Sequence, residues 1–133
     1  MSIQTNLLNI KATLPKQVTL VAVSKTNPVS DLMEAYEAGQ CIFGENKIQE
    51  MTEKWEQMPK DIQWHMIGHV QTNKVKFMAP FVSLIHGVDS LKLLQEINKQ
   101  AKKNNRTIDC VLQVYIAEEE TKLGLDEEEL TSL

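Results

Sequence analysis

The sequence has few of the features that mark several large classes of protein. Among its 133 residues are 2 cysteines, Cys41 and Cys110, and they do not form a C-x-x-C motif. Two structural thiols in a reducing compartment are expected, with a disulfide as the alternative. The apolar runs are only as long as strands, and the N-terminus has no basic start followed by an apolar block. We therefore expect neither a membrane span nor a signal peptide, and we predict a cytoplasmic protein.

Positive charge is not in excess either. Lysine and arginine number 14 against 18 aspartate and glutamate residues, and no basic stripe is interleaved with aromatics, so nucleic-acid binding is not expected. Glycine-rich phosphate loops and a nucleophile elbow are also absent. His65 and His69 have the spacing of a helical zinc pair, but His65 falls in an apolar run typical of a strand. Four residues along a strand span about 13 Å, so no metal site is expected.

What is present is an alternation of short apolar runs with amphipathic segments. Hydrophobic residues make up 42% of the chain and charged residues 24%, as in an ordinary globular domain. The apolar runs predict strands at 18–24, 41–43, 62–67, 81–86 and 108–116. Apolar residues at helical spacing predict helices between these strands, and Ser30 or Asp31 is the expected N-cap of the helix that follows Pro28.

This alternation predicts an α/β fold with a parallel sheet. Each strand–helix unit is long enough for a right-handed crossover between parallel strands. Five strands permit either an open doubly wound sheet or the first five strands of a TIM-type (β/α)₈ barrel, which is complete only at roughly 200 residues or more. In the barrel case the two outer strands have bare hydrogen-bonding edges. The chain would then be a fragment, or another chain would cover those edges, and self-association through them is one possibility.

Lys25 is the residue around which the predicted chemistry is organised. The run from Val18 to Ser24 is largely apolar and β-branched and leads directly into this lysine, and Pro28 prevents the strand from continuing. We expect a strand buried on both faces with a primary amine at its carboxyl end, where α/β folds place their sites. Partial dehydration there would lower the pKa of the amine and allow it to form a Schiff base. The alternative is a lysine that points into water and has no chemical role.

Parallel strands would bring other polar side chains to the same edge of the sheet. This edge would collect Lys25, the turns at 44–46 and 68–69, and His86. A lysine together with an asparagine and histidines suits an aldehyde-bearing ligand bound as an imine. Asn46 is as well explained as a helix cap, and His86 as an ordinary histidine at a strand end.

Four blocks of the sequence resemble the pyridoxal 5′-phosphate homeostasis proteins. The blocks read VAVSKT at 21–26, FGEN at 43–46, WHMIGHVQTNK at 64–74 and LQV at 112–114. They follow the order found in the family and are spread over most of the chain. The family is similar in fold to the N-terminal barrel of alanine racemase. The resemblance therefore implies that residues 1–133 are a single domain, the N-terminal part of a pyridoxal-phosphate-binding (β/α)₈ barrel that is incomplete in this chain.

The resemblance also implies a cofactor and the residues that hold it. Pyridoxal 5′-phosphate would be carried as a Schiff base on Lys25, with Asn46, Ile67 and His69 as neighbours of its ring. The family is thought to bind, buffer and hand over the cofactor without turnover, so apoenzymes that depend on it are the expected partners. The family's phosphate-binding segment comes from the last barrel strands, so we expect this chain to be truncated and to hold the cofactor weakly.

Three rival functions use the same features differently. An amino-acid racemase of the same fold type would use the same imine, and a Schiff-base aldolase would use Lys25 against a sugar phosphate without any cofactor. An interaction module would use only the exposed strand edges. Racemases of this fold type draw an opposing acid or base from an added domain, which nothing in this sequence supplies. We therefore predict a cofactor carrier rather than an enzyme.

Overall fold

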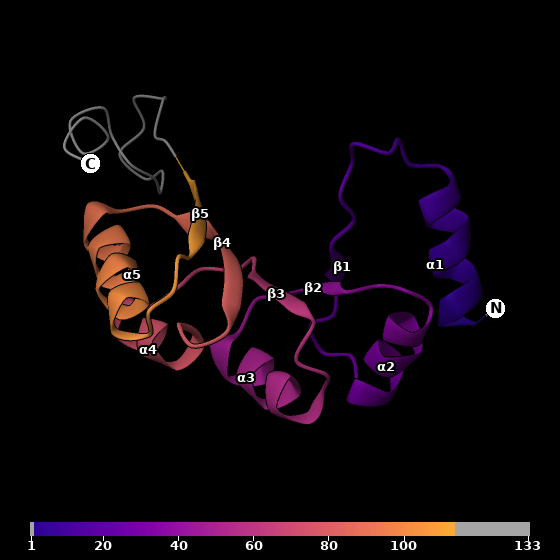
Figure 1. Ribbon diagram of the computed structural model, residues 1–133, viewed down its shortest axis with the longest axis horizontal. Helices are drawn as coiled ribbons and strands as arrows, with labels where there is room; N and C mark the ends of the chain where they lie inside the picture. The colour runs from indigo at the N-terminus through magenta and orange to yellow at the C-terminus, as the bar shows by residue number, and fades with distance from the viewer. Residues whose placement is uncertain (1, 114–133) are drawn as a thin grey trace.

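The computed structural model describes residues 2–113, which form one curved parallel sheet with helices along its outer side (Figure 1). The strands are β1 (Ala22–Val23), β2 (Ile42–Glu45), β3 (Gln63–Met66), β4 (Val82–Val88) and β5 (Asp109–Leu112). The helical segments are α1 (Ile3–Ala12), α2 (Val29–Glu37), α3 (Ile48–Gln57), η1 (Thr72–Lys74), α4 (Val75–Met78) and α5 (Leu91–Lys103). None of these described helices is long and apolar enough to cross a membrane.

The strand order follows the chain. Neighbouring strands pair in parallel in the order β1-β2-β3-β4-β5, and each connection carries a helix to the convex side of the arc (Figure 1). The prediction of an α/β chain that forms the first five strands of a TIM-type barrel is confirmed. The predicted end of the fifth strand at 114–116 lies outside the described residues.

The first two strands differ from their predicted bounds. β1 contains only Ala22 and Val23, and Val23 is 54% exposed, so the prediction of a strand over 18–24 buried on both faces is wrong. Apolar residues show what a strand can bury, whereas its length depends on the partners available, and β1 pairs with β2 alone. β2 continues through Gly44 to Glu45, because a glycine in a strand is compatible with close packing on its neighbours.

Two predicted helix starts are also displaced. α2 begins directly after Pro28, whose extended backbone makes it the N-cap, so neither Ser30 nor Asp31 caps this helix. A proline fixes φ and cannot donate a hydrogen bond, which suits the position just before a helix. α3 begins after Lys47 as its N-cap, so Asn46 is not the cap of that helix. Its side chain is therefore available for other contacts.

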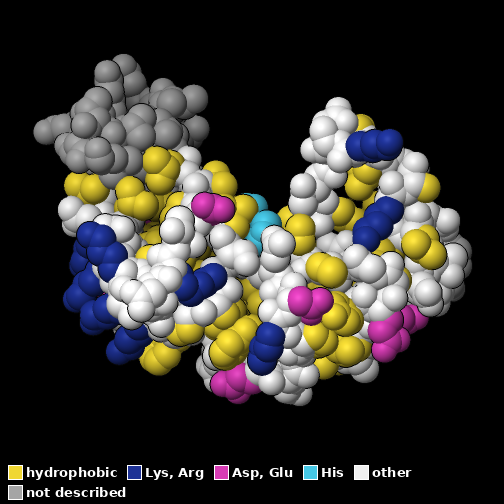
Figure 2. Space-filling view, in the orientation of Figure 1, with side chains coloured by type: hydrophobic (Ala, Val, Ile, Leu, Met, Phe, Trp, Pro, Cys, Tyr) yellow, Lys and Arg dark blue, Asp and Glu magenta, His cyan; other side chains and the backbone are white. Residues whose placement is uncertain are grey.

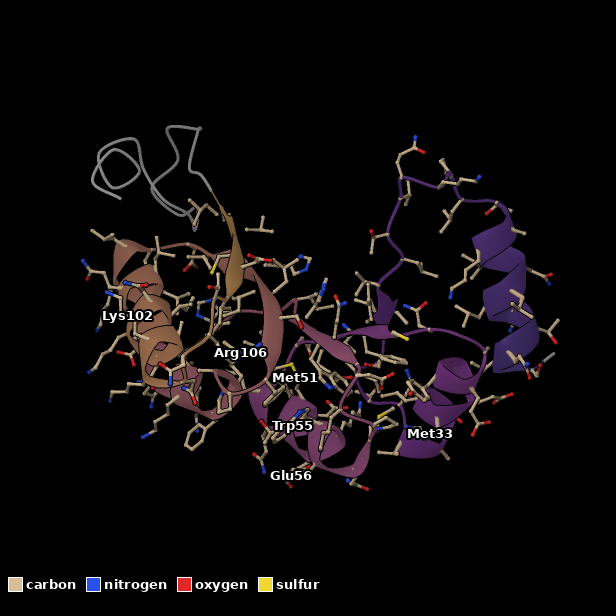
Figure 3. All side chains as sticks on the ribbon, in the orientation of Figure 1. Met33, Met51, Trp55, Glu56, Lys102 and Arg106 are labelled. Atoms are coloured by element: carbon tan, nitrogen blue, oxygen red, sulfur yellow. The ribbon has the colours of Figure 1, made fainter. Side chains whose placement is uncertain are left out.

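The hydrophobic core lies between the sheet and the helices. Its largest fully buried side chains from the strands are Phe43, Trp64, Met66 and Ile85. On α3, Met51 lies on the side that faces the sheet and Glu56 on the far side (Figure 3). Each fully buried large apolar side chain contributes about 1.5–3 kcal/mol. These side chains belong to a buried cluster that joins the strands to the helices.

Close packing at two glycines joins β2 and the turn after it to the segments on either side. A side chain on Gly44 would come within 3.1 Å of Val21 and 3.2 Å of Ile67, so these residues meet on the inner face of the sheet. A Cβ on Gly68 would lie 2.6 Å from the Cβ of Asn46 and 2.7 Å from its carbonyl oxygen. The turn after β3 therefore packs directly on the turn after β2.

A histidine pair lies on the inner face. His65 is in register with Gly44, and its Nδ1 is 3.3 Å from Nε2 of His86 on β4. Histidine atoms are visible at the base of the hollow between the two ends of the arc (Figure 2). Burial and the nearby His86 together lower the pKa of His65. The neutral form of His65 is thus favoured in the folded chain.

Gly68→Ala tests the packing of the two turns. The new Cβ would meet backbone atoms of Asn46 that cannot move aside alone, so we expect the free energy of unfolding to fall by about 1–3 kcal/mol. Gly87→Ala is the matched control, since its Cβ has no neighbour nearer than 3.4 Å and should cost less than about 0.5 kcal/mol. Urea unfolding measures both, and equal stability of the two variants would contradict the packing described.

His65→Gln tests the histidine pair. Because the pKa of His65 is lower in the folded than in the unfolded chain, the unfolded chain binds more protons below the ordinary value of 6.5. The stability from the neutral imidazole is therefore present above pH 6.5 and is lost as pH falls through the folded pKa. We expect His65→Gln to flatten the fall in unfolding free energy below pH 6.5, measured by urea unfolding at several pH values. An unchanged slope in His65→Gln would contradict this account of the histidine pair.

Candidate functional site at the carboxyl edge of the sheet

Lys25 lies just beyond β1, at the carboxyl edge of the sheet. The N–H of Ser24 donates to the carbonyl of Gly44 at 2.9 Å, which extends the pairing of β1 with β2 by one residue. Ser24 is buried and its Oγ donates to Oε2 of Glu45 at the end of β2, and Lys25 follows it in the turn at this edge. The Lys25 side chain is exposed in the part of the chain that the structure describes. The expectation of a partly dehydrated amine is therefore wrong for this structure, because the inner face is open to solvent here.

The backbone on both sides of Lys25 is held by hydrogen bonds. The carbonyl of Lys25 accepts from Oγ1 of Thr26 at 2.6 Å and from Nδ2 of Asn27 at 3.4 Å. The N–H of Thr26 donates to Oε2 of Glu50 at 2.6 Å. Thr26 has φ of 64°, the left-handed region that a β-branched residue adopts only at a cost of about 1–3 kcal/mol. Such a conformation persists only where its surroundings fix it. Here the hydrogen bond from the Thr26 N–H to Glu50 contributes to this.

A buried ammonium group connects this loop to the neighbouring elements. Nζ of Lys54, on α3, donates to the carbonyl of Ser24 at 2.7 Å, to Oε2 of Glu45 at 2.9 Å and to Oε2 of Glu50 at 2.7 Å. These three bonds use all the donors of the ammonium group. Lys54 is 6% exposed and Glu45 is fully buried. We name Ser24, Glu45, Glu50 and Lys54 the buried polar network.

The charges within the buried polar network depend on one another. Glu45 also accepts a hydrogen bond from Oγ of Ser24, and its second oxygen, Oε1, has no partner among the described residues. The hydrogen bond from Lys54 lowers the pKa of Glu50, assisted by the N–H of Thr26 and opposed by desolvation. Removing one member of a buried ion pair costs about 3–5 kcal/mol, because the other charge remains without its partner. The network therefore holds the loop firmly to β2 and α3.

Sequence reasoning missed the buried polar network, although two signals were available. Lys54 stands three residues after Met51 and one before Trp55, so it falls within the apolar stripe of its helix rather than on the solvent side. Glu45 has the same parity as the buried Phe43 in its strand. A lysine and a glutamate predicted at core positions of adjacent elements would have indicated a buried pair.

The other predicted site residues reach the same edge but divide into two groups. Ile67 packs against Gly44 on the inner face. Asn46 and His69 instead line a cavity of about 530 Å³ between α3 and the segment formed by η1 and α4. Lys25 and Ile67 are not among its lining residues. The structure therefore brings all four residues to one edge without placing them around one cavity.

His69 has an acidic neighbour and no metal-binding partners. Its Nδ1 lies 3.7 Å from Oδ2 of Asp89, and its side chain is 64% exposed. Within residues 2–113 no group of three or more histidine, cysteine or acidic side chains is arranged to hold a metal ion. The geometry of the edge thus offers an accessible primary amine on a fixed backbone, with polar side chains on the next two strand ends.

Several known proteins are similar to this chain in sequence. Curated relatives include a "Pyridoxal phosphate homeostasis protein" from Aquifex aeolicus, 43% identical over 115 residues that cover 86% of this chain and 50% of the relative. One of the same name from Escherichia coli is 35% identical over 90% of this chain and 53% of its own length. The chain thus spans about half the length of the curated relatives it matches.

Solved structures show the same fold. PipY of Synechococcus elongatus, determined with pyridoxal phosphate bound, has a TM-score of 0.86 at 34% identity, covering 98% of this chain and 61% of PipY. Alanine racemase from Bartonella henselae shares the fold, with a TM-score of 0.73 at 18% identity, over 100% of this chain and 38% of the racemase. The family described as "Alanine racemase, N-terminal domain" matches residues 1–133. The chain belongs to this alanine racemase N-terminal domain family, and its curated relatives are pyridoxal phosphate homeostasis proteins.

Proposed function

We propose that this chain binds pyridoxal 5′-phosphate as an imine on Lys25 and takes part in holding and supplying the cofactor to apoenzymes. The observation that carries the proposal is an exposed primary amine on a backbone fixed on both sides, at the carboxyl edge of a parallel sheet. Sites of α/β folds are built at this edge from the loops that follow the strands. A fixed backbone with a free side chain suits a group that must meet an aldehyde repeatedly and release it.

The comparisons support this cofactor for two reasons. PipY, at 34% identity, has been solved with pyridoxal phosphate bound. The curated relatives carry the name of a homeostasis protein for the same cofactor. The carrier role proposed here, rather than a catalytic one, follows those names.

The chemistry at Lys25 requires little from the protein. The neutral amine adds to the aldehyde carbon, a C=N bond replaces the C=O bond, and the aldehyde oxygen leaves as water. Ile67, on the inner face beside Gly44, supplies an apolar contact for the ring. We also propose polar contacts to the cofactor from Asn46 and His69 at the ends of the next two strands, although in this structure they line a cavity that does not include Lys25.

Reductive trapping tests the proposed lysine. We expect pyridoxal phosphate to give an imine absorbance with the 133-residue chain, and borohydride to fix the label on the peptide that contains Lys25. Lys25→Ala should lose the label, because among residues 2–113 no other lysine has its flanking peptide groups held at this edge by Glu50 and Lys54. Lys16→Ala, which removes an exposed lysine from the loop before β1, is the control and should label like the parent chain. Label that persists on another lysine in Lys25→Ala would refute the assignment.

The carrier role is tested by looking for turnover. We expect the chain loaded with pyridoxal phosphate to form no D-isomer from any single L-amino acid, because racemisation needs a second acid or base opposite the imine. Chiral chromatography after long incubation measures this, with an alanine racemase as the positive control. Accumulation of a D-amino acid that depends on Lys25 would show an enzyme instead.

A further inference from the structure

The buried polar network contacts the segment 24–26 at two points, one on each side of Lys25. On the N-terminal side, Nζ of Lys54 holds the carbonyl of Ser24 at 2.7 Å. On the C-terminal side, Oε2 of Glu50 holds the N–H of Thr26 at 2.6 Å. Lys54 and Glu50 are themselves joined at 2.7 Å. The Glu50–Lys54 ion pair therefore forms hydrogen bonds to both peptide groups that flank Lys25.

We propose that Glu50 and Lys54 are positioning residues that orient Lys25 for imine formation, an inference that rests on the proposed function. Their hydrogen bonds go to the main chain on either side of Lys25, to Glu45 and to each other, and none of these bonds is to the Lys25 amine. Their effect is on the direction in which the Cα–Cβ bond of Lys25 leaves the backbone. Imine formation needs the amine aligned with an aldehyde carbon, and a misplacement of about 1 Å can cost about a hundredfold.

The strained backbone of Thr26 supports a positioning role over a purely stabilising one. A threonine at φ of 64° is unfavourable, so a segment that only had to connect β1 to α2 would relax to a commoner conformation. Glu50 holds this conformation through the N–H of Thr26, while the side chain of the intervening Lys25 stays exposed. The buried polar network thus fixes the main chain on both sides of Lys25 and leaves the Lys25 side chain exposed.

Glu50 is the residue to change. Removing Lys54 would leave Glu45 as a buried carboxylate without its cation, whereas the Glu50 side chain is 25% exposed and its loss is tolerated more easily. Glu50→Ala removes the acceptor of the Thr26 N–H, and Glu50→Gln keeps an oxygen acceptor without the charge. Glu37→Ala removes an exposed helical carboxylate from α2 and is the matched control.

The experiment follows the imine absorbance of the full chain with pyridoxal 5′-phosphate, together with amide hydrogen exchange of Thr26. We expect Glu50→Ala to form the imine about tenfold to a hundredfold more slowly or weakly, with faster exchange at Thr26, while remaining folded by circular dichroism. Glu50→Gln should recover most of the loss, and Glu37→Ala should match the parent chain.

Two outcomes separate this inference from the proposed function. If Lys25→Ala still forms the imine, the proposed function fails whatever Glu50 does. If Lys25→Ala abolishes the imine but folded Glu50→Ala forms it as the parent chain does, the proposed function stands and the positioning role is refuted. A loss in Glu50→Ala that merely follows the fraction of unfolded chain would refute the positioning role as well.

Discussion

The structure of the candidate site depends on one buried ammonium group. Lys54 donates to a carbonyl of the β1–α2 loop, a carboxylate at the end of β2 and a carboxylate on its own helix. A cation can be kept in a protein interior only if its donors are all satisfied and an opposite charge is near. Because its three acceptors come from three different elements, satisfying this one group fixes their relative positions at the edge of the sheet.

The two faces of the sheet have different roles. Its outer face carries the large buried side chains and the polar network, and so provides rigidity. Its inner face carries Gly44, Ile67 and the histidine pair, and Lys25 follows β1 at the carboxyl edge of the same sheet. In a barrel the carboxyl ends of the strands meet at one face, and the active sites of this fold are built at that face. Alternation along each strand lets neighbouring residues serve both roles, as Phe43 and Gly44 do in β2.

Sequence reasoning succeeded where local pattern has a single cause. Apolar runs separated by amphipathic helices predict parallel strands because the crossover needs a helix, and the structure confirms five such strands. The position of Lys25 at a strand end followed from the apolar run and Pro28. Burial was predicted less well: the strand at 18–24 shrank to two residues, and Lys25 proved exposed. Pattern gives a residue's capacity to be buried, and only neighbouring elements decide whether it is.

The sequence by itself determined the α/β class, the parallel order of the strands and the lysine at the end of the first one, because each follows from the spacing of residues along the chain. Only the tertiary structure decided how that lysine is held. The bonds that fix its backbone join residues as much as thirty positions apart, Ser24 and Lys54, and their buried charges are stable only once the surrounding side chains exclude water. Local sequence cannot contain that condition, since it depends on contacts between segments that meet only in the folded chain.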